Sequence, residues 1–278
     1  MLHSLKDLDH YTIEASDGDI GHVEDFYFDD LVWVIRYLVV ETGPWLASRK
    51  VLISPQAIRH PNWSEQTLPA VLTREQVRNS PDIDTDKPIS RQHEIQYLGY
   101  YGYPYYWDGV GIFGGVMAPD MFPIGGPDNS SEREVYEKTN LATEKAEQSR
   151  QRDDDPHLRS CEAVIGYHVH ATDGEIGHIQ GFLVDEASWA IRYLIVNTSN
   201  WWLGHQVIIA PQWFKDVNWA EQKISVGLNR QSVMDSPIYD SALALNRKIE
   251  KDLYAHYQRV GYWPEELAQE PEHSRTEG

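Results

Sequence analysis

Apolar and polar residues alternate in short runs along the first hundred residues, and Gly, Pro, Asn and Asp separate these runs. Short runs of period two predict β-strands. The most apolar run, 33–40, is rich in β-branched and aromatic residues, which are enriched in strands. The predicted strands are 11–15, 20–28, 33–40, 50–54 and 67–72. Strands at such close spacing, with frequent turns, predict a small closed or half-closed barrel.

Residues typical of turns and helix caps lie between and after the predicted strands. Asp17-Gly18 predicts a hairpin with a two-residue type I′ loop. The Thr-Arg-Glu-Gln run at 73–76 is a capping box and predicts a short helix. Ser80-Pro81 ends this helix, because the residue before proline is pushed out of the α region. A second helix is predicted after Ser90, followed by an aromatic tail.

The whole pattern occurs twice. Asp-Gly-Asp-Ile-Gly-His at 17–22 recurs as Asp-Gly-Glu-Ile-Gly-His at 173–178, an offset of 156 residues. The same offset aligns residues 2 to 107 with the second half without a gap. Asn229 takes the N-cap position of the first helix there, and the second helix is predicted to begin after Asn246. Further matches are Ile-Arg-Tyr-Leu at 35–38 and 191–194, Asn-Trp at 62–63 and 218–219, and Tyr-Trp at 106–107 and 262–263. The sequence therefore predicts an internal duplication, with one domain at 1–107 and the other at 157–263.

The segment between the two copies, 108–156, has a different composition. Its first part is rich in Gly and Pro, and its second part is strongly charged. We interpret it as a flexible linker with an r.m.s. span of about 35–40 Å, long enough to allow many arrangements of the two domains. The last residues, 264–278, are predicted to be a disordered acidic tail.

Charge restricts the classes of partner. The chain has 43 Asp and Glu against 24 Lys and Arg, a formal charge of -19. We expect no direct nucleic-acid binding, since that affinity depends on cations, and no attraction to anionic membranes. Cys161 is the single cysteine, which excludes an internal disulfide framework. Residues 1–7 lack the apolar core of a signal peptide, and no apolar run is long enough to insert into a membrane, so we expect a cytoplasmic protein.

The duplicated motifs resemble the PRC-barrel family. The resemblance rests on Asp-Gly-x-Ile-Gly-His, on Trp-x-Ile-Arg-Tyr-Leu-(Val/Ile)-Val, and on (Leu/Ile)-Ile-(Ser/Ala)-Pro. Asn-Trp-x-Glu-Gln, Ser-Pro and the Tyr-Trp tail are similar to a bacterial subgroup with two such domains. The implied fold is mainly β with short helices: two small PRC-type β-barrels related by internal duplication, each followed by C-terminal helices and an aromatic tail.

The resemblance implies a barrel used as an assembly module that contacts other macromolecules. The family includes the cytoplasmic domain of the photosynthetic reaction-centre H subunit and the C-terminal domain of a ribosome-maturation factor. Our leading hypothesis is a non-enzymatic, soluble scaffolding protein that binds proteins. One alternative is an accessory to a membrane electron-transfer or photosynthetic complex, and another is a ribosome-assembly factor. Whether the two barrels pair with each other or form homo-oligomers stays open.

Candidate interface residues are arginines and aromatics. Arg36 and Arg192 interrupt apolar strands, and each needs a carboxylate such as Asp29 or Asp185, or a place on an interface. Aromatic side chains are common in binding hot spots. The aromatic candidates are Trp45, Trp201 and Trp202 in loops, and Tyr105, Tyr106 and Trp107 in the tail of the first copy. For the tails we favour a second interpretation, as lids over small cores.

No catalytic motif is present in the sequence. We find no nucleophile elbow, phosphate-binding loop or dinucleotide fingerprint. His22 and His178 are an aligned pair, but one histidine per copy is too few for a metal site unless both copies share an ion. A hydrogen-bonded residue at a strand edge is the simpler interpretation. We therefore expect no catalytic residues, no metal and no cofactor.

Overall fold

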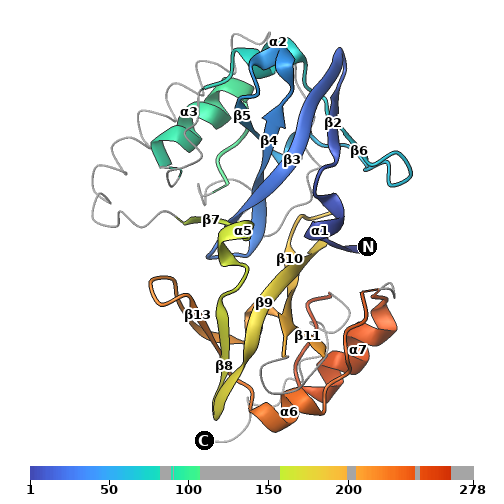
Figure 1. Ribbon diagram of the computed structural model, residues 1–278, viewed down its shortest axis with the longest axis vertical. Helices are drawn as coiled ribbons and strands as arrows, with labels where there is room; N and C mark the ends of the chain where they lie inside the picture. The colour runs from blue at the N-terminus through green and yellow to red at the C-terminus, as the bar shows by residue number, and fades with distance from the viewer. Residues whose placement is uncertain (82–88, 90, 107–156, 199–204, 242–244, 264–278) are drawn as a thin grey trace, which may run out of the picture. The chain divides into compact units, whose positions relative to one another are not determined.

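A computed structural model describes residues 1–81, 89, 91–106, 157–198, 205–241 and 245–263 (Figure 1). The protein is mainly β with few short helices, in two separate mixed sheets. This confirms the predicted class at that level. The predicted linker 108–156 and tail 264–278 lie outside the described residues.

The chain divides into two compact units. Unit 1 comprises Met1–Asp7, Ala163–Glu186 and Ile191–Gly278, and unit 2 comprises Leu8–Glu162 and Ala187–Ala190. The units therefore do not coincide with the two sequence copies, because each contains a short piece of the other copy.

Unit 2 holds a six-stranded sheet with the order β5-β4-β3-β2-β6, and β7 pairs with β3. Its strands are β2 (Thr12–Ala15), β3 (Gly18–Asp29), β4 (Val34–Thr42), β5 (Lys50–Ile53), β6 (Thr67–Pro69) and β7 (Leu158–Ser160). Its helices are η1 (Pro44–Leu46), η2 (Pro55–Ala57), α2 (Arg74–Arg78) and α3 (Arg91–Tyr101).

Unit 1 holds a seven-stranded sheet with the order β11-β10-β9-β8-β13-β12, and β1 pairs with β9. Its strands are β1 (Leu2–Ser4), β8 (His168–Ala171), β9 (Gly174–Asp185), β10 (Ile191–Asn197), β11 (Gln206–Ile209), β12 (Phe214–Asn218) and β13 (Lys223–Val226). Its helices are η4 (Pro211–Trp213), α6 (Arg230–Met234) and α7 (Arg247–His256). Two four-residue helices, α1 (Leu5–Leu8) and α5 (Cys161–Val164), lie where the chain passes between units.

The two sheets repeat one topology. In each, a long hairpin is flanked by a short strand that pairs antiparallel with the hairpin and parallel with a later strand: β2 with β6, and β8 with β13. In each unit the last helix, α3 or α7, lies beside the strand at one edge of the sheet, β5 or β11 (Figure 1). No pairing among the described strands closes either sheet. The extra strand β12 was not predicted from the sequence.

Each sheet also includes a strand from the other copy. β1, at the start of the first copy, pairs antiparallel with β9 of the second, with Leu2 opposite Asp185. β7, at the start of the second copy, pairs antiparallel with β3 of the first, with Leu158 opposite Asp29. These two pairings are equivalent under the 156-residue offset. The copies have therefore exchanged their first strands reciprocally.

The predicted helix caps are confirmed. The Thr73 side chain accepts from the Gln76 amide and the Gln76 side chain accepts from the Thr73 amide, which is the capping box. Asn229 and Asn246 accept from the amides of Ser232 and Ile249 at 2.7 and 3.1 Å. These bonds satisfy amides that have no partner inside a helix.

Two local predictions were wrong. The first hairpin turns at Ser16–Asp17, and of these residues and Gly18 only Gly18 has a positive φ, 126°. A type I′ loop needs positive φ at both central residues, which Ser16 and Asp17 avoid. Trp33 is not in a strand either: it has a left-handed φ of 56° before β4, and its ring stacks on Phe28 at 4.9 Å. Trp33 therefore belongs to the turn between β3 and β4, where its ring contacts the end of β3.

Candidate protein-interaction site

Arg36 and Tyr106, two of the predicted interface residues, lie together in unit 2. The Arg36 guanidinium carbon is 3.9 Å from the centre of the Tyr106 ring. Its Nη2 donates to Asp29 Oδ2 at 3.4 Å, which confirms the predicted pairing with Asp29. The arginine therefore joins the end of the long hairpin to the aromatic tail.

The structure adds a residue that the sequence analysis missed, Glu94 on α3. Its side chain is buried, and Glu94 Oε1 accepts hydrogen bonds from the hydroxyls of Tyr37 and Tyr106. Tyr37 lies on β4, so one carboxylate connects the sheet, the helix and the tail. We call Arg36, Tyr37, Glu94 and Tyr106 the clamp of unit 2.

Unit 1 contains the same clamp at the offset of 156, formed by Arg192, Tyr193, Glu250 and Tyr262. Glu250 Oε1 accepts from the hydroxyls of Tyr193 and Tyr262 at 2.8 and 2.7 Å. Arg192 lies over the Tyr262 ring at 4.1 Å, and Arg247 pairs with Glu250 Oε2 at 3.0 Å. The alignment of the copies contained the signal for this site, because all four residue types are identical at equivalent positions.

The pKa shifts of the clamp tyrosines indicate that these residues hold the tail in place and do not transfer protons. Burial raises the pKa of Tyr37 and of Tyr193 well above the usual phenol value, and raises the pKa of Tyr262 to about 12. These phenols therefore stay protonated near neutral pH and can donate to the glutamate but cannot act as bases. The clamp can hold the tail against the sheet.

Tyr105 lies in the same tail and is half-buried. It packs with Tyr101, Tyr103 and Tyr106 against a buried core cluster. The members of that cluster are Tyr27, Tyr37, Val39, Leu52, Ile89, Tyr97, Leu98 and Leu158. Most of the described tail of the first copy therefore covers core, which is the lid interpretation, although Tyr105 and Tyr106 keep part of their surface exposed.

Trp45 lies in η1, at another place on unit 2. Its indole Nε1 donates to the Ile20 carbonyl at 2.8 Å, which fixes the ring. The guanidinium carbons of Arg74 and Arg78 lie 4.3 and 5.8 Å from the ring centre. Trp45 and Arg74 are half-buried and Arg78 is exposed, so an ordered Trp–Arg surface faces solvent. We call these three residues the Trp45 patch.

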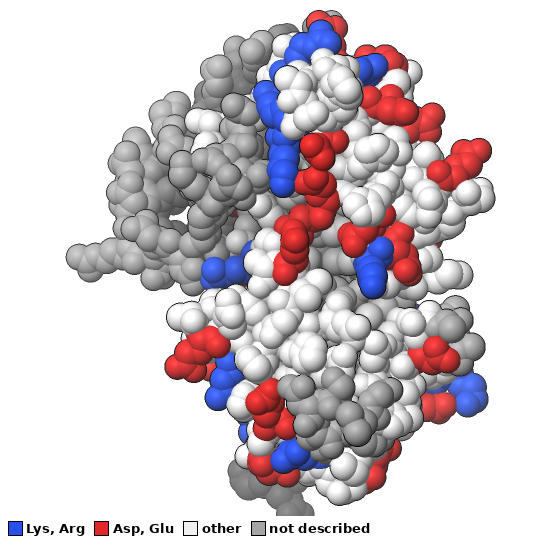
Figure 2. Space-filling view, viewed as in Figure 1, with Lys and Arg blue, Asp and Glu red and all other residues white. Residues whose placement is uncertain are grey.

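The remaining predicted interface residues, Trp107, Trp201 and Trp202, lie outside the described residues. Figure 2 shows acidic and basic side chains interspersed over the described part of the visible face, with broad uncharged areas between them.

Asp25 anchors the exchanged strand in unit 2. Its Oδ2 accepts from Ser160 Oγ at 2.6 Å, and its Oδ1 accepts from the Glu162 and Phe26 amides at 3.0 and 2.7 Å. Desolvation by burial is the largest influence on this carboxyl, and the Glu162 charge acts in the same direction, so its pKa is raised although the hydrogen bonds oppose this.

We expect Asp25→Ala to lower the free energy of unfolding by about 2 kcal/mol, because three donors lose their acceptor, and two of these hydrogen bonds are partly buried. Asp25→Asn keeps one acceptor oxygen and removes a buried charge, so its effect at neutral pH should be small. Because the folded pKa is raised, protonation of Asp25 stabilises the fold fully below the unfolded pKa, and this contribution is lost as pH rises through the folded pKa.

Denaturant titrations of wild type and Asp25→Asn from pH 4 to pH 8 check this result. The stability of wild type relative to the variant should fall as pH rises. A difference that is constant with pH, or that grows with pH, would show that Asp25 does not titrate as described.

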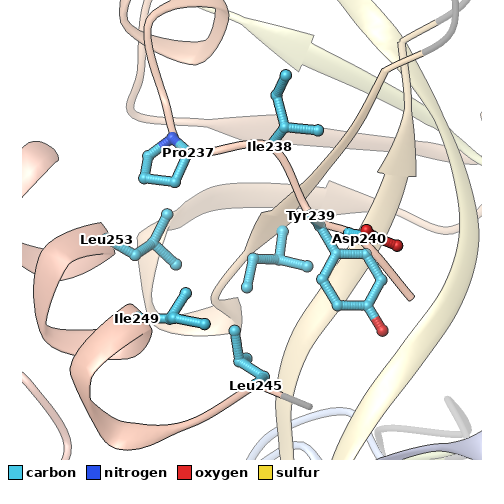
Figure 3. Close-up of a pocket in the computed structure, with 8 residues that line it drawn as sticks. Pro237, Ile238, Tyr239, Asp240, Leu245, Ile249 and Leu253 are labelled. Atoms are coloured by element: carbon cyan, nitrogen blue, oxygen red, sulfur yellow. The ribbon is translucent and has the colours of Figure 1, made fainter. Parts of the chain in front are cut away.

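An apolar cavity in unit 1 is too small for a metabolite. Its volume is about 50 Å³, and Leu245, Ile249 and Leu253 turn toward Tyr239 and Pro237 around it (Figure 3). The cavity in another protein that binds benzene has about 150 Å³. The space is large enough for a few water molecules at most.

The two aligned histidines belong to different units. His22 is exposed on β3, with Nδ1 3.2 Å from Thr12 Oγ1, and His178 lies opposite Asn197 in unit 1. Within the described ranges, no group of three or more His, Cys, Asp and Glu could hold a metal ion. The helices of the described residues are all too short or too polar to cross a membrane.

The chain was compared with families and with curated proteins. No family model matches it, and no curated protein matches it.

Proposed function

We propose that the chain is a non-enzymatic scaffolding protein built from two duplicated PRC-barrel-like modules that bind other proteins. The repeated motifs and the repeated strand order support the modular part of the proposal. We further propose that each sheet curls into a small barrel, because β2 and β8 connect the hairpin to a parallel strand on their far side.

The Trp45 patch is the observation that favours protein binding. Trp, Tyr and Arg are the residues enriched in binding hot spots, and the patch combines a Trp with two Arg. Here a hydrogen bond fixes the indole and one arginine lies on it, so little side-chain entropy is lost on binding. In the clamps, by contrast, the polar groups hydrogen-bond to one another inside each unit, so they do not favour a partner.

A binding experiment with charge-reversal variants tests this proposal. The full-length chain is immobilised and incubated with separate soluble, membrane and ribosomal fractions of its native cell. A stoichiometric protein partner, purified from the bound material, should bind Arg78→Glu about thirtyfold more weakly, as expected for a hot spot of about 2 kcal/mol.

Arg59→Glu is the matched control, because Arg59 is also exposed on unit 2 and the charge change is the same. Its affinity should equal that of the wild type. Equal weakening by both variants would assign the effect to net charge and reject the Trp45 patch. Recovery of no stoichiometric partner from any fraction would reject the scaffolding proposal.

A further inference from the structure

In each unit the exchanged strand pairs with the last three residues of the long first hairpin strand, Tyr27–Asp29 of β3 or Leu183–Asp185 of β9, and we call this part of the strand the acceptor edge. In unit 2, side chains at the acceptor edge contact specific side chains of the exchanged strand. Leu158 of β7 is buried in the core cluster. Next to it, Arg159 Nε donates to Asp30 Oδ2 at 2.8 Å, and Ser160 Oγ donates to Asp25. The edge of β3 therefore fits a strand of the form Leu, basic residue, Ser.

The acceptor edge in unit 1 fits the same form. β1 reads Leu2-His3-Ser4, and His3 Nε2 lies 2.7 Å from Glu186 Oε2. The Met1 carbonyl accepts from the Glu186 amide at 3.0 Å. Every one of these contacts is non-covalent, so neither edge can distinguish a strand of its own chain from the same strand of another copy.

The path of the chain makes an exchange between molecules possible. Residues 1–106 supply β1 to unit 1 and most of unit 2, whereas residues 157–263 supply β7 to unit 2 and most of unit 1. The two halves therefore hold each other at two strand pairings. The segment 107–156 is the only covalent connection between them, and both of its neighbours, Tyr106 and His157, belong to unit 2. Its 50 residues can reach about 165 Å when extended.

We propose that the acceptor edges of β3 and β9 also bind the first strands of a second copy of the chain, giving a strand-exchanged dimer beside the self-paired monomer. In this dimer the half 1–106 of one molecule pairs with the half 157–263 of the other. The contacts are the same in both forms, so concentration decides between them. A covalent tether of this length gives an effective concentration of order mM, so the monomer dominates at about 10 µM and the dimer becomes comparable near about 1 mM. This proposal is independent of the proposed scaffolding function.

The test uses two full-length variants, each with one added cysteine. Leu2→Cys and Asp185→Cys lie directly opposite in the pairing of β1 with β9, and both positions are half-buried. Opposed residues of an antiparallel pair lie about 4.5–5.5 Å apart, within disulfide range. The variants are mixed, unfolded, refolded together at about 10 µM or about 0.5 mM, oxidised, and separated by size and by non-reducing electrophoresis.

A disulfide between the two variants requires β1 of one molecule on β9 of the other. We expect this species in the dimer fraction, at a yield at least about tenfold higher after refolding at the higher concentration. A mixture of Leu31→Cys with Asp185→Cys controls for random collision, because Leu31 is 69% exposed and far in sequence from β1. Both cysteines in one chain should give the intrachain disulfide of the monomer.

Two results would overturn the proposal. One is a monomer alone at every refolding concentration. The other is a dimer whose cross-linking through Leu2→Cys is no greater than through Leu31→Cys, which would show association by another surface.

Discussion

Gly21→Ala and Gly177→Ala should each lower the free energy of unfolding by about 3 kcal/mol or more. A Cβ atom on Gly21 would lie 1.9 Å from the Glu41 carbonyl oxygen, and one on Gly177 would lie 2.0 Å from the Asn197 carbonyl oxygen. Both obstacles are backbone atoms of the neighbouring strand, so relief requires opening the long hairpin. Gly177 also has a φ of 141°, which adds strain for any L side chain.

Chemical denaturation of the full-length variants measures this effect. Gly181→Ala is the control in the same strand, because its Cβ would meet only Ile195 Cδ1, at 3.5 Å. It should change stability far less. Equal losses for Gly177→Ala and Gly181→Ala would mean that any added Cβ on this part of β9 is unfavourable, and that the close approach to Asn197 does not explain why both copies have glycine here.

The duplication and most elements could be predicted from the sequence because their causes are local. Alternation placed β2, β3 and β5 within two residues of their observed bounds. Side chains with specific capping chemistry located α2 and α7 at Thr73 and Asn246. The Asp-Gly motif marked a turn correctly, but the backbone angles depend on which residue tolerates positive φ, and that is Gly18.

The strand exchange could not be predicted, and the reason lies in the duplication itself. Ser4 and Ser160 are equivalent, and so are the edges of β3 and β9, so the pattern is the same whichever edge each strand joins. Only side chains that differ between the copies carry information. Arg159 is one such residue, because it pairs with Asp30, whereas the equivalent His3 lies against Glu186.

Some differences between the copies are compensating pairs. Ala57 and Tyr97 in unit 2 become Trp213 and Leu253 in unit 1. Tyr97 packs on Tyr101 at 4.8 Å, and Trp213 packs on the equivalent Tyr257 at 4.9 Å. A large ring therefore packs on the equivalent tyrosine in both units. It comes from α3 in unit 2 and from η4 in unit 1. Sequence reasoning on one copy cannot show this, because the volume is shared between elements distant in the chain.

The candidate site shows the same division between local and tertiary causes. Arg36 was identified because a cation in an apolar strand requires a partner, and Asp29 was close in sequence. Glu94 was missed because glutamate is ordinary on a helix, and its burial depends on Tyr37 and Tyr106, which come from a strand and a tail. An identical glutamate in both copies, facing identical tyrosines, was the available signal.

The clamp in unit 1 gives the other large expected effect. Glu250→Ala should lower the free energy of unfolding by about 3–5 kcal/mol, because two hydroxyl donors lose a buried acceptor, at about 1–3 kcal/mol each, and the pairing with Arg247 is lost as well. The Tyr193 and Tyr262 hydroxyls would lose their acceptor and Arg247 its carboxylate. Glu250→Gln keeps an oxygen that accepts from both hydroxyls, and it also removes a buried charge, so its cost should be about 1 kcal/mol.

Denaturant unfolding of both variants, with near-ultraviolet circular dichroism of the tyrosines, distinguishes a clamp from an ordinary buried residue. Glu221→Ala, an exposed change in the same unit, should leave both measurements nearly unchanged. If Glu250→Gln costs as much as Glu250→Ala, the charge on Glu250 and its pairing with Arg247 dominate, and the hydroxyl bonds are secondary. If Glu250→Ala is tolerated, the tail is held by the packing of Tyr254 and Trp263 alone, and the duplicated glutamate needs another explanation.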